Sequence, residues 1–123
     1  MNIKGYVKTV VDKDNLVLLA EVKSVEQLQI NNIECILADN IFTIVFFTDK
    51  KSLQVRRSLN DWESFLPKNI FVRVNRKTIV NLQHVKTVEK STNQTLKLHM
   101  GNYEDPIIMS RSYISKLKGN LII

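Results

Sequence analysis

The sequence contains little cysteine, glycine or proline. Its 123 residues include one cysteine, three glycines and two prolines. The single cysteine, Cys35, excludes a disulfide within the chain and fits a reducing cytoplasm. The scarcity of glycine and proline argues against low-complexity segments and extended linkers. We therefore expect one folded domain that is held together without covalent cross-links.

A long apolar run is also missing. No stretch approaches the roughly 20 apolar residues that are needed to cross a bilayer. The first fifteen residues lack the uninterrupted apolar segment of a signal peptide. Apolar residues make up 44 % of the chain and charged residues 24 %, which is ordinary for a globular protein. These values predict a cytoplasmic protein that makes no membrane contact.

Side chains for catalysis or metal binding are sparse. Cys35 lies inside an apolar run, where a small buried side chain is expected. His84 and His99 have no second Cys or His at metal-ligand spacing, and no glycine-rich phosphate loop is present. We expect no enzyme activity, metal, cofactor or small-molecule substrate. Carboxylates brought together only by folding are the one route left to an active site.

Positive charge is concentrated in the second part of the chain. Residues 1–49 carry four lysines against seven acidic residues, a net charge of −3. Residues 50–123 carry fourteen Lys or Arg against five acidic residues, a net charge of +9. Such a distribution is typical of a protein with a polyanionic partner, although many basic domains have none.

Short apolar runs separated by polar turns recur along the chain. Residues 15–22 fit either a buried strand or a short helix. Period-two alternation and branched residues predict strands at 25–30, 33–37, 41–47, 52–57, 70–74, 78–82, 85–89, 95–100 and 106–110. The sequence therefore predicts a mostly β domain of short antiparallel strands in small packed sheets.

One short helix is predicted near residues 58–66. Ser58 is a good N-cap residue, with Asp61 three positions later. The apolar residues Leu59, Trp62, Phe65 and Leu66 recur at helical spacing, and Pro67 then ends the segment. Near the C-terminus, residues 113–117 can form one closing turn of helix.

The stretch FVRVNRKTIVNL (71–82) places a polar cationic loop between two apolar runs. It occurs within a set of ordered segments that resembles the LytTR DNA-binding domain of bacterial transcriptional regulators. The other segments are VRRSL (55–59), LP (66–67) and SRSYISKL (110–117). The resemblance covers about residues 24–118. It leaves 1–23 as an N-terminal extension, an arm or an extra strand, and 119–123 as a tail.

The resemblance implies an elongated β sandwich that inserts loops into the major grooves of duplex DNA. Asn40, Phe42 and Thr43 match the first contacting loop, although DNIF (39–42) replaces the family's usual glycine-containing segment. Arg111 and Ser112 match the last loop, with Ser112 in place of a second arginine. Of Arg56 and Arg57, strand alternation directs one toward phosphate and the other into the protein; we choose Arg57 for DNA.

The central loop contains the main candidates for DNA contact. The guanidinium of Arg76 can bind a guanine through two hydrogen bonds. Lys77 is suited to phosphate, and Asn75 can contact either base or phosphate. The alternative is an ordinary solvated turn. Arg73 fits the family pattern, but its role is open because it can face solvent or pair with an acidic residue inside the domain.

Two functions from different classes follow. The first is sequence-specific binding of double-stranded DNA at promoter repeats by a bacterial transcriptional regulator, with a homodimer on DNA as a further expectation. The second is a protein-interaction module that binds a regulatory partner. LytTR domains usually follow a receiver domain of a two-component system, and residues 1–23 are too few to form one. We therefore expect either a stand-alone regulator or part of a longer response regulator.

Overall fold

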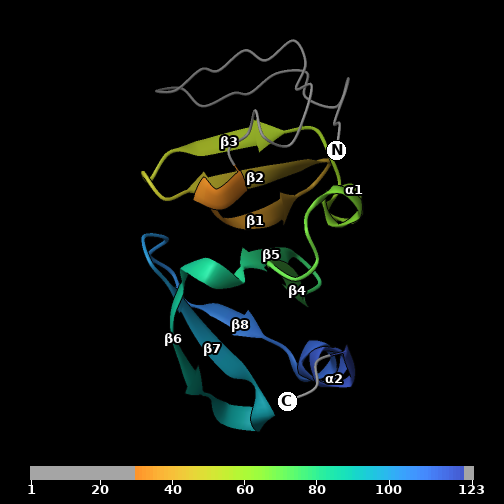
Figure 1. The fold of residues 1–123 in the computed structure, drawn as a ribbon, viewed down its shortest axis with the longest axis vertical. Helices are drawn as coiled ribbons and strands as arrows, with labels where there is room; N and C mark the ends of the chain where they lie inside the picture. Colours follow the sequence, from red (N-terminus) through yellow and green to blue (C-terminus); the bar gives the residue numbers. More distant parts are fainter. Residues whose placement is uncertain (1–29, 121–123) are drawn as a thin grey trace.

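A computed structural model describes residues 30–120. In this part of the chain, eight strands form two antiparallel sheets that are accompanied by two α-helices (Figure 1). The elements are β1 (Ile33–Asp39), β2 (Phe42–Phe47), β3 (Ser52–Val55), α1 (Leu59–Phe65), β4 (Phe71–Asn75), β5 (Thr78–Asn81), β6 (Val85–Lys90), β7 (Leu96–Met100), β8 (Ile107–Met109) and α2 (Arg111–Asn120). Short 3-10 turns occupy Ile30–Asn32, Leu82–His84 and Thr92–Gln94. The predicted mostly β class is confirmed.

The five-stranded sheet has the order β3-β2-β1-β5-β4, and the three-stranded sheet has the order β6-β7-β8. In Figure 1 the larger sheet extends from the upper part of the picture to its middle, and the smaller sheet lies below it. Hairpins join β1 to β2 and β4 to β5, and β1 pairs directly with β5. This pairing makes neighbours of residues that are 41 to 45 positions apart in the sequence, from Leu37 with Thr78 to Cys35 with Val80.

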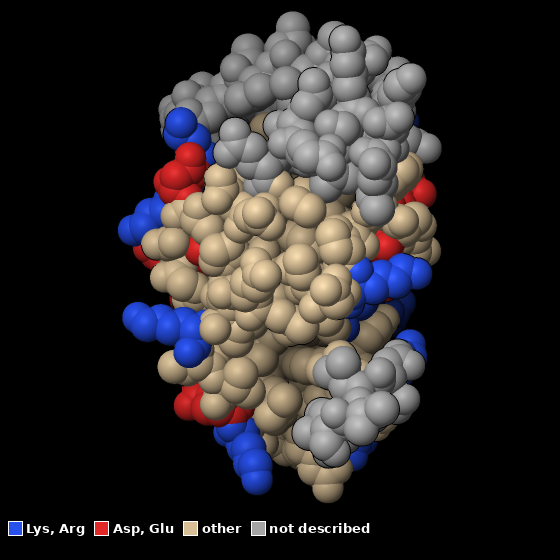
Figure 2. Space-filling view, viewed as in Figure 1, with Lys and Arg blue, Asp and Glu red and all other residues tan. Residues whose placement is uncertain are grey.

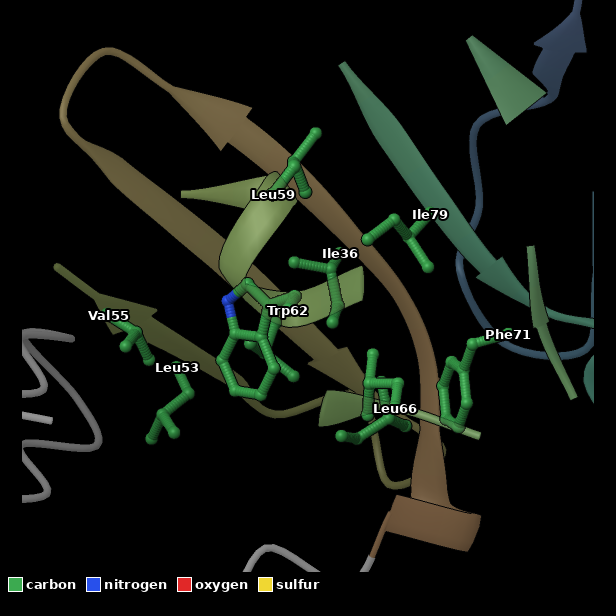
Figure 3. Packing of buried hydrophobic residues seen from close by; sticks show 10 residues of the cluster. Ile36, Leu53, Val55, Leu59, Trp62, Leu66, Phe71 and Ile79 are labelled. Atoms are coloured by element: carbon green, nitrogen blue, oxygen red, sulfur yellow. The ribbon is translucent and has the colours of Figure 1, made fainter. Parts of the chain in front are cut away.

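Alternate side chains of the larger sheet belong to two hydrophobic clusters. Ile36 packs with Trp62 and Leu59 of α1 in the first cluster, which Figure 3 shows. Its neighbour Cys35 belongs to the second cluster, which includes Leu98 of the smaller sheet. Period-two alternation thus lets a single strand bury side chains in both clusters.

The predicted short helix forms with the predicted ends. The Ser58 side chain accepts a hydrogen bond from the backbone N–H of Asp61 at 3.1 Å, which satisfies a donor of the first turn. Leu59 and Trp62 are buried. Leu66 has extended dihedral angles immediately before Pro67, as the clash with a proline ring requires.

The C-terminal helix is longer than predicted. We expected one turn, whereas α2 contains ten residues. Tyr113, Ile114 and Leu117 pack against the second hydrophobic cluster. Ile114 and Leu117 lie one and four positions after Tyr113. This spacing places the three side chains along one face of a helix and favours a helix that extends beyond one turn. Neither described helix has the length and apolar character required to cross a membrane.

Several predictions fall on residues that are not described. These are the alternatives for residues 15–22, most of the strand at 25–30, and the N-terminal extension 1–23. Residue 24 also lies outside the described part of the chain, and the domain limits of 24 and 118 both stay predictions.

Candidate nucleic-acid interface

Two predicted contact loops lie at the same edge of the larger sheet. The β1–β2 hairpin is closed by pairing of Asp39 with Phe42, and the β4–β5 hairpin by pairing of Asn75 with Thr78. The Ala38 N–H donates a 2.8 Å hydrogen bond to the Lys77 carbonyl, which joins the two hairpins. Adjacent strands in a sheet are about 5 Å apart, so the two turns are close neighbours.

The third predicted loop joins the same edge through two hydrogen bonds. The Ser110 N–H donates to the Val74 carbonyl at 3.0 Å, and Asn75 Nδ2 donates to the Ile108 carbonyl at 2.8 Å. The junction between β8 and α2 is thereby held against the end of β4. We call the combined surface of residues 39–42, 75–77 and 110–112 the loop edge.

The loop edge is mostly exposed and carries more positive than negative charge. Its cations are Arg76, Lys77 and Arg111, and its one acidic residue is Asp39; all four are exposed. In Figure 2, Lys and Arg side chains protrude at both margins of the molecule; those at the right margin lie on the side where α1 and α2 lie in Figure 1. Several fixed cations at one edge are suited to a surface rich in phosphate.

The predicted site residues differ in their accessibility. Asn40, Arg76, Lys77, Arg111 and Ser112 are exposed, whereas Phe42 and Asn75 are half-buried. Asn40 has a φ of 56°, a left-handed conformation that asparagine tolerates better than most residues. Asn40 is therefore suited to the left-handed backbone of this turn.

The Asn75 side chain is already bonded within the protein. Its Oδ1 accepts a hydrogen bond from the Lys77 N–H at 2.8 Å, and its Nδ2 donates to the Ile108 carbonyl. The first bond is a local turn of the kind that asparagine favours. Asn75 thus joins the hairpin turn to β8, which favours a positioning role over the predicted DNA contact.

The structure shows which groups Arg73 contacts, a question that the sequence left open. Its Nη1 lies 2.7 Å from Glu63 Oε1 and donates to Asn60 Oδ1 at 3.1 Å. Its Nε donates to the Asn75 carbonyl at 3.1 Å, and its Nη2 donates to the Arg76 carbonyl. The residue therefore pairs with an acid inside the domain, which is one of the two alternatives that we predicted.

Thr43 was predicted to contact DNA, and the structure corrects this assignment. Its side chain is only 1 % exposed. Its Oγ1 accepts a 2.8 Å hydrogen bond from Trp62 Nε1. Thr43 lies on the inward face of β2, one position beyond Phe42, so period-two alternation directs its side chain toward α1.

Arg57 requires a similar correction. It is 3 % exposed, and its guanidinium carbon lies 4.3 Å from the Phe65 ring centre and 5.1 Å from the Trp62 ring centre. Its Nη2 also donates to the Asp61 carbonyl at 3.2 Å. One arginine is exposed and the other buried, as predicted, but Arg56 is the exposed member, and both residues lie beyond the end of β3 at Val55 rather than within the predicted strand 52–57.

Sequence reasoning missed Ile41, which is 59 % exposed at the tip of the β1–β2 hairpin. We counted it as the first residue of an apolar strand. The preceding Asp39–Asn40 turn signal was present, and a two-residue hairpin would have placed Ile41 in the turn. Ile41 adds an apolar side chain beside the polar members of the loop edge.

The structure offers no sign of a catalytic or metal-binding group among the described residues. Burial raises the pKa of the Cys35 thiol far above its ordinary value. Asn81 is buried, and its Nδ2 donates to the Ile33 carbonyl at 2.9 Å. Across residues 30–120, no three His, Cys, Asp or Glu side chains form a group that could hold a metal ion.

Comparisons with known proteins agree with the fold and with the predicted family. A model of the LytTr DNA-binding domain matches residues 12–122. A solved LytTr DNA-binding domain from Bacillus cereus superposes with a TM-score of 0.70 and is 26 % identical in sequence. That match covers 93 % of this chain and 94 % of the solved one.

Two curated relatives carry the name sensory transduction protein LytR. The protein from Staphylococcus epidermidis is 36 % identical over 74 residues, which cover 60 % of this chain and 29 % of the relative. The protein from Streptococcus mutans is 30 % identical over 76 residues, which cover 62 % of this chain and 31 % of the relative. The match thus spans about three-tenths of the length of these relatives.

Proposed function

Because this chain belongs to the LytTR DNA-binding domain family, we propose that its loop edge forms the contact surface for duplex DNA. The supporting observation is the hydrogen bond from Ala38 to Lys77, which places two predicted contact loops side by side. The bonds from Ser110 and Asn75 add the third loop. Three segments that are distant in sequence thereby meet at one edge, and two of them, 75–77 and 110–112, carry exposed cations.

The exposed members of the loop edge other than Asp39 and Ile41 have proposed roles. Arg76 contacts a guanine in the major groove, because its planar fork matches the N7 and O6 acceptors. Lys77 and Arg111 contact phosphates and position the domain. Asn40 and Ser112 donate hydrogen bonds to base edges or phosphates, and the half-buried Phe42 supports the first loop. Arg56 replaces Arg57 as the candidate for a more distant phosphate contact.

The wider proposal is that the chain acts in a bacterial transcriptional regulator. Its LytR relatives are described as sensory transduction proteins, and they are longer than the matched segment. We propose sequence-specific binding at promoter repeats in the cytoplasm, with two copies on paired half-sites. Control by a receiver domain of a two-component system belongs to the same proposal. The expected role is binding without a chemical reaction.

The test is selection of bound duplexes from a random pool, followed by affinity measurements on the enriched sequence. We expect a repeated motif to be enriched. Affinity should fall steeply with salt, with a slope of log affinity against log salt of roughly −0.9 for each neutralised phosphate. A random duplex of equal length serves as the control for non-specific binding. No enrichment, together with no binding to the random duplex at low salt, would exclude the proposal.

A further inference from the structure

We propose that Arg73 is a positioning residue, which fixes the β4–β5 turn so that Arg76 is presented to a base. The inference rests on the proposed DNA-binding role of the loop edge. It assigns a function to an arginine whose guanidinium is bonded within the domain. Four hydrogen-bond partners support the assignment, two on α1 and two in the turn.

The turn side of the network consists of backbone carbonyls. Arg73 Nε donates to the Asn75 carbonyl at 3.1 Å, and Nη2 donates to the Arg76 carbonyl. These carbonyls belong to the two peptide units on either side of the Arg76 α-carbon, which determine where the Arg76 side chain begins. Because a charged donor binds a carbonyl more strongly than a neutral one, the contacts restrict the turn at the residue proposed to contact the base.

The helix side of the network holds the guanidinium in place. Glu63 Oε1 lies 2.7 Å from Nη1, and Asn60 Oδ1 accepts from the same nitrogen at 3.1 Å. Both residues belong to α1, whose buried Trp62 fixes the helix against the larger sheet. The side chain of Arg73 is 17 % exposed, and that of Glu63 is 46 % exposed. The turn is thereby connected to the packed core through one side chain.

A lysine could not make this set of contacts. Arginine has five N–H donors in a rigid plane, whereas lysine has one nitrogen at the end of a flexible chain. The observed bonds use Nε, Nη1 and Nη2, so they require the whole fork. A role that depended only on positive charge would need no such geometry. Replacing Arg73 with lysine therefore distinguishes a positioning role from a role that depends on charge alone.

The experiment measures the affinity of purified variants for two probes. One is the duplex enriched by selection with the unaltered chain, and the other is a random duplex of equal length. We expect Arg73→Ala and Arg73→Lys each to lower affinity for the selected duplex by about tenfold, within the range expected when a bidentate base contact is lost. Affinity for the random duplex should change less than about twofold, because phosphate contacts are kept.

A double-variant comparison identifies the mechanism. In the background of Arg76→Ala, the Arg73→Ala change should have little further effect on the selected duplex, because the side chain that it positions is absent. Glu63→Gln should reproduce part of the loss without altering the arginine. Lys68→Ala removes another exposed cation, from the start of the segment that leads into β4, and should leave the preference between the two probes unchanged.

Three results would overturn the inference. One is full affinity in Arg73→Lys, which would show that charge alone suffices. The second is an equal loss on both probes for Arg73→Ala, which would indicate a phosphate contact or general unfolding. The third is a double variant, Arg73→Ala with Arg76→Ala, whose loss of affinity for the selected duplex equals the sum of the two single losses. If the unaltered chain binds neither duplex, the proposed DNA-binding function itself fails. If Arg76→Ala loses specificity and Arg73→Ala keeps it, the DNA-binding function stands and only the positioning role of Arg73 fails.

Discussion

Glu34 and Asn102 join the two sheets through a buried carboxylate. Glu34 in β1 has no solvent exposure. Its oxygens accept hydrogen bonds from the Asn102 N–H at 2.9 and 3.0 Å and from Asn102 Nδ2 at 2.9 Å. The Tyr103 N–H adds a bond of 3.0 Å. These donors lie in the loop between β7 and β8, so one side chain of the larger sheet orders a loop of the smaller one.

Replacing this carboxylate should destabilise the domain. Glu34→Gln exchanges one acceptor oxygen for an amide donor that faces the donors of Asn102. Leaving buried groups unsatisfied typically costs about 1–3 kcal/mol, and more where charge is involved. We expect the free energy of unfolding, measured by urea denaturation, to fall by at least about 1 kcal/mol.

Glu104→Gln is the matched control for this change. Glu104 is an exposed carboxylate two positions after Asn102. Surface substitutions usually change stability by less than about 0.5 kcal/mol. Equal unfolding free energies for the two variants would contradict a linking role for Glu34.

Arg76 and Lys77 should affect DNA binding in different ways. We expect Arg76→Ala to cost about 1–3 kcal/mol on the selected duplex and to relax preference at one base position. Lys77→Ala should weaken binding to all duplexes by similar amounts and reduce the salt slope by about one. Fluorescence anisotropy with single-base probe variants measures both effects. The same response in both variants would refute the division between base and phosphate contacts.

Thr43 should contribute to stability and not directly to DNA binding. Thr43→Val keeps the side-chain shape but removes the acceptor of the Trp62 indole N–H, which is left buried without that bond. The expected loss of unfolding free energy is about 1–3 kcal/mol. Thr87→Val on the exposed face of β6 is the control. A specific loss of affinity in a fully folded Thr43→Val protein would restore the original assignment.

The Glu89–His99 pair predicts a small pH effect. His99 Nε2 lies 2.8 Å from Glu89 Oε1, and this bond holds the pKa of Glu89 below its ordinary value. Because the folded-state pKa is depressed, the stabilisation is present above the unfolded-state pKa and is lost as pH falls through the folded-state pKa. Both side chains are well exposed, so the contribution to stability should be minor.

Carbon NMR titration of the Glu89 carboxyl group tests this interaction directly. His99→Ala should raise the pKa of Glu89 toward its ordinary value. Lys97→Ala should raise it less, because Lys97 acts only through a weaker charge interaction. An unchanged titration midpoint in His99→Ala would show that the pair does not persist in solution.

The local elements were largely predictable from the sequence. Strand alternation around Ile36 and Ile79, the Ser58 cap and the stop at Pro67 all depend on neighbours within a few residues. The length of α2 was underestimated, because the apolar stripe through Leu117 gains its stabilisation from the second hydrophobic cluster. Packing against another element is a tertiary effect that a local pattern indicates only weakly.

The sequence by itself determined the fold class, the family and the cationic turn at Arg76, because side-chain periodicity, capping and motif order are recorded along the chain. Only the tertiary structure decided which side chains are available at the surface. Pairing of β1 with β5 created the loop edge, α1 buried Thr43 and Arg57, and the approach of α1 to β4 gave Arg73 its partners. These outcomes depend on contacts between distant segments, and one residue of register or rotation changes which side chain is exposed.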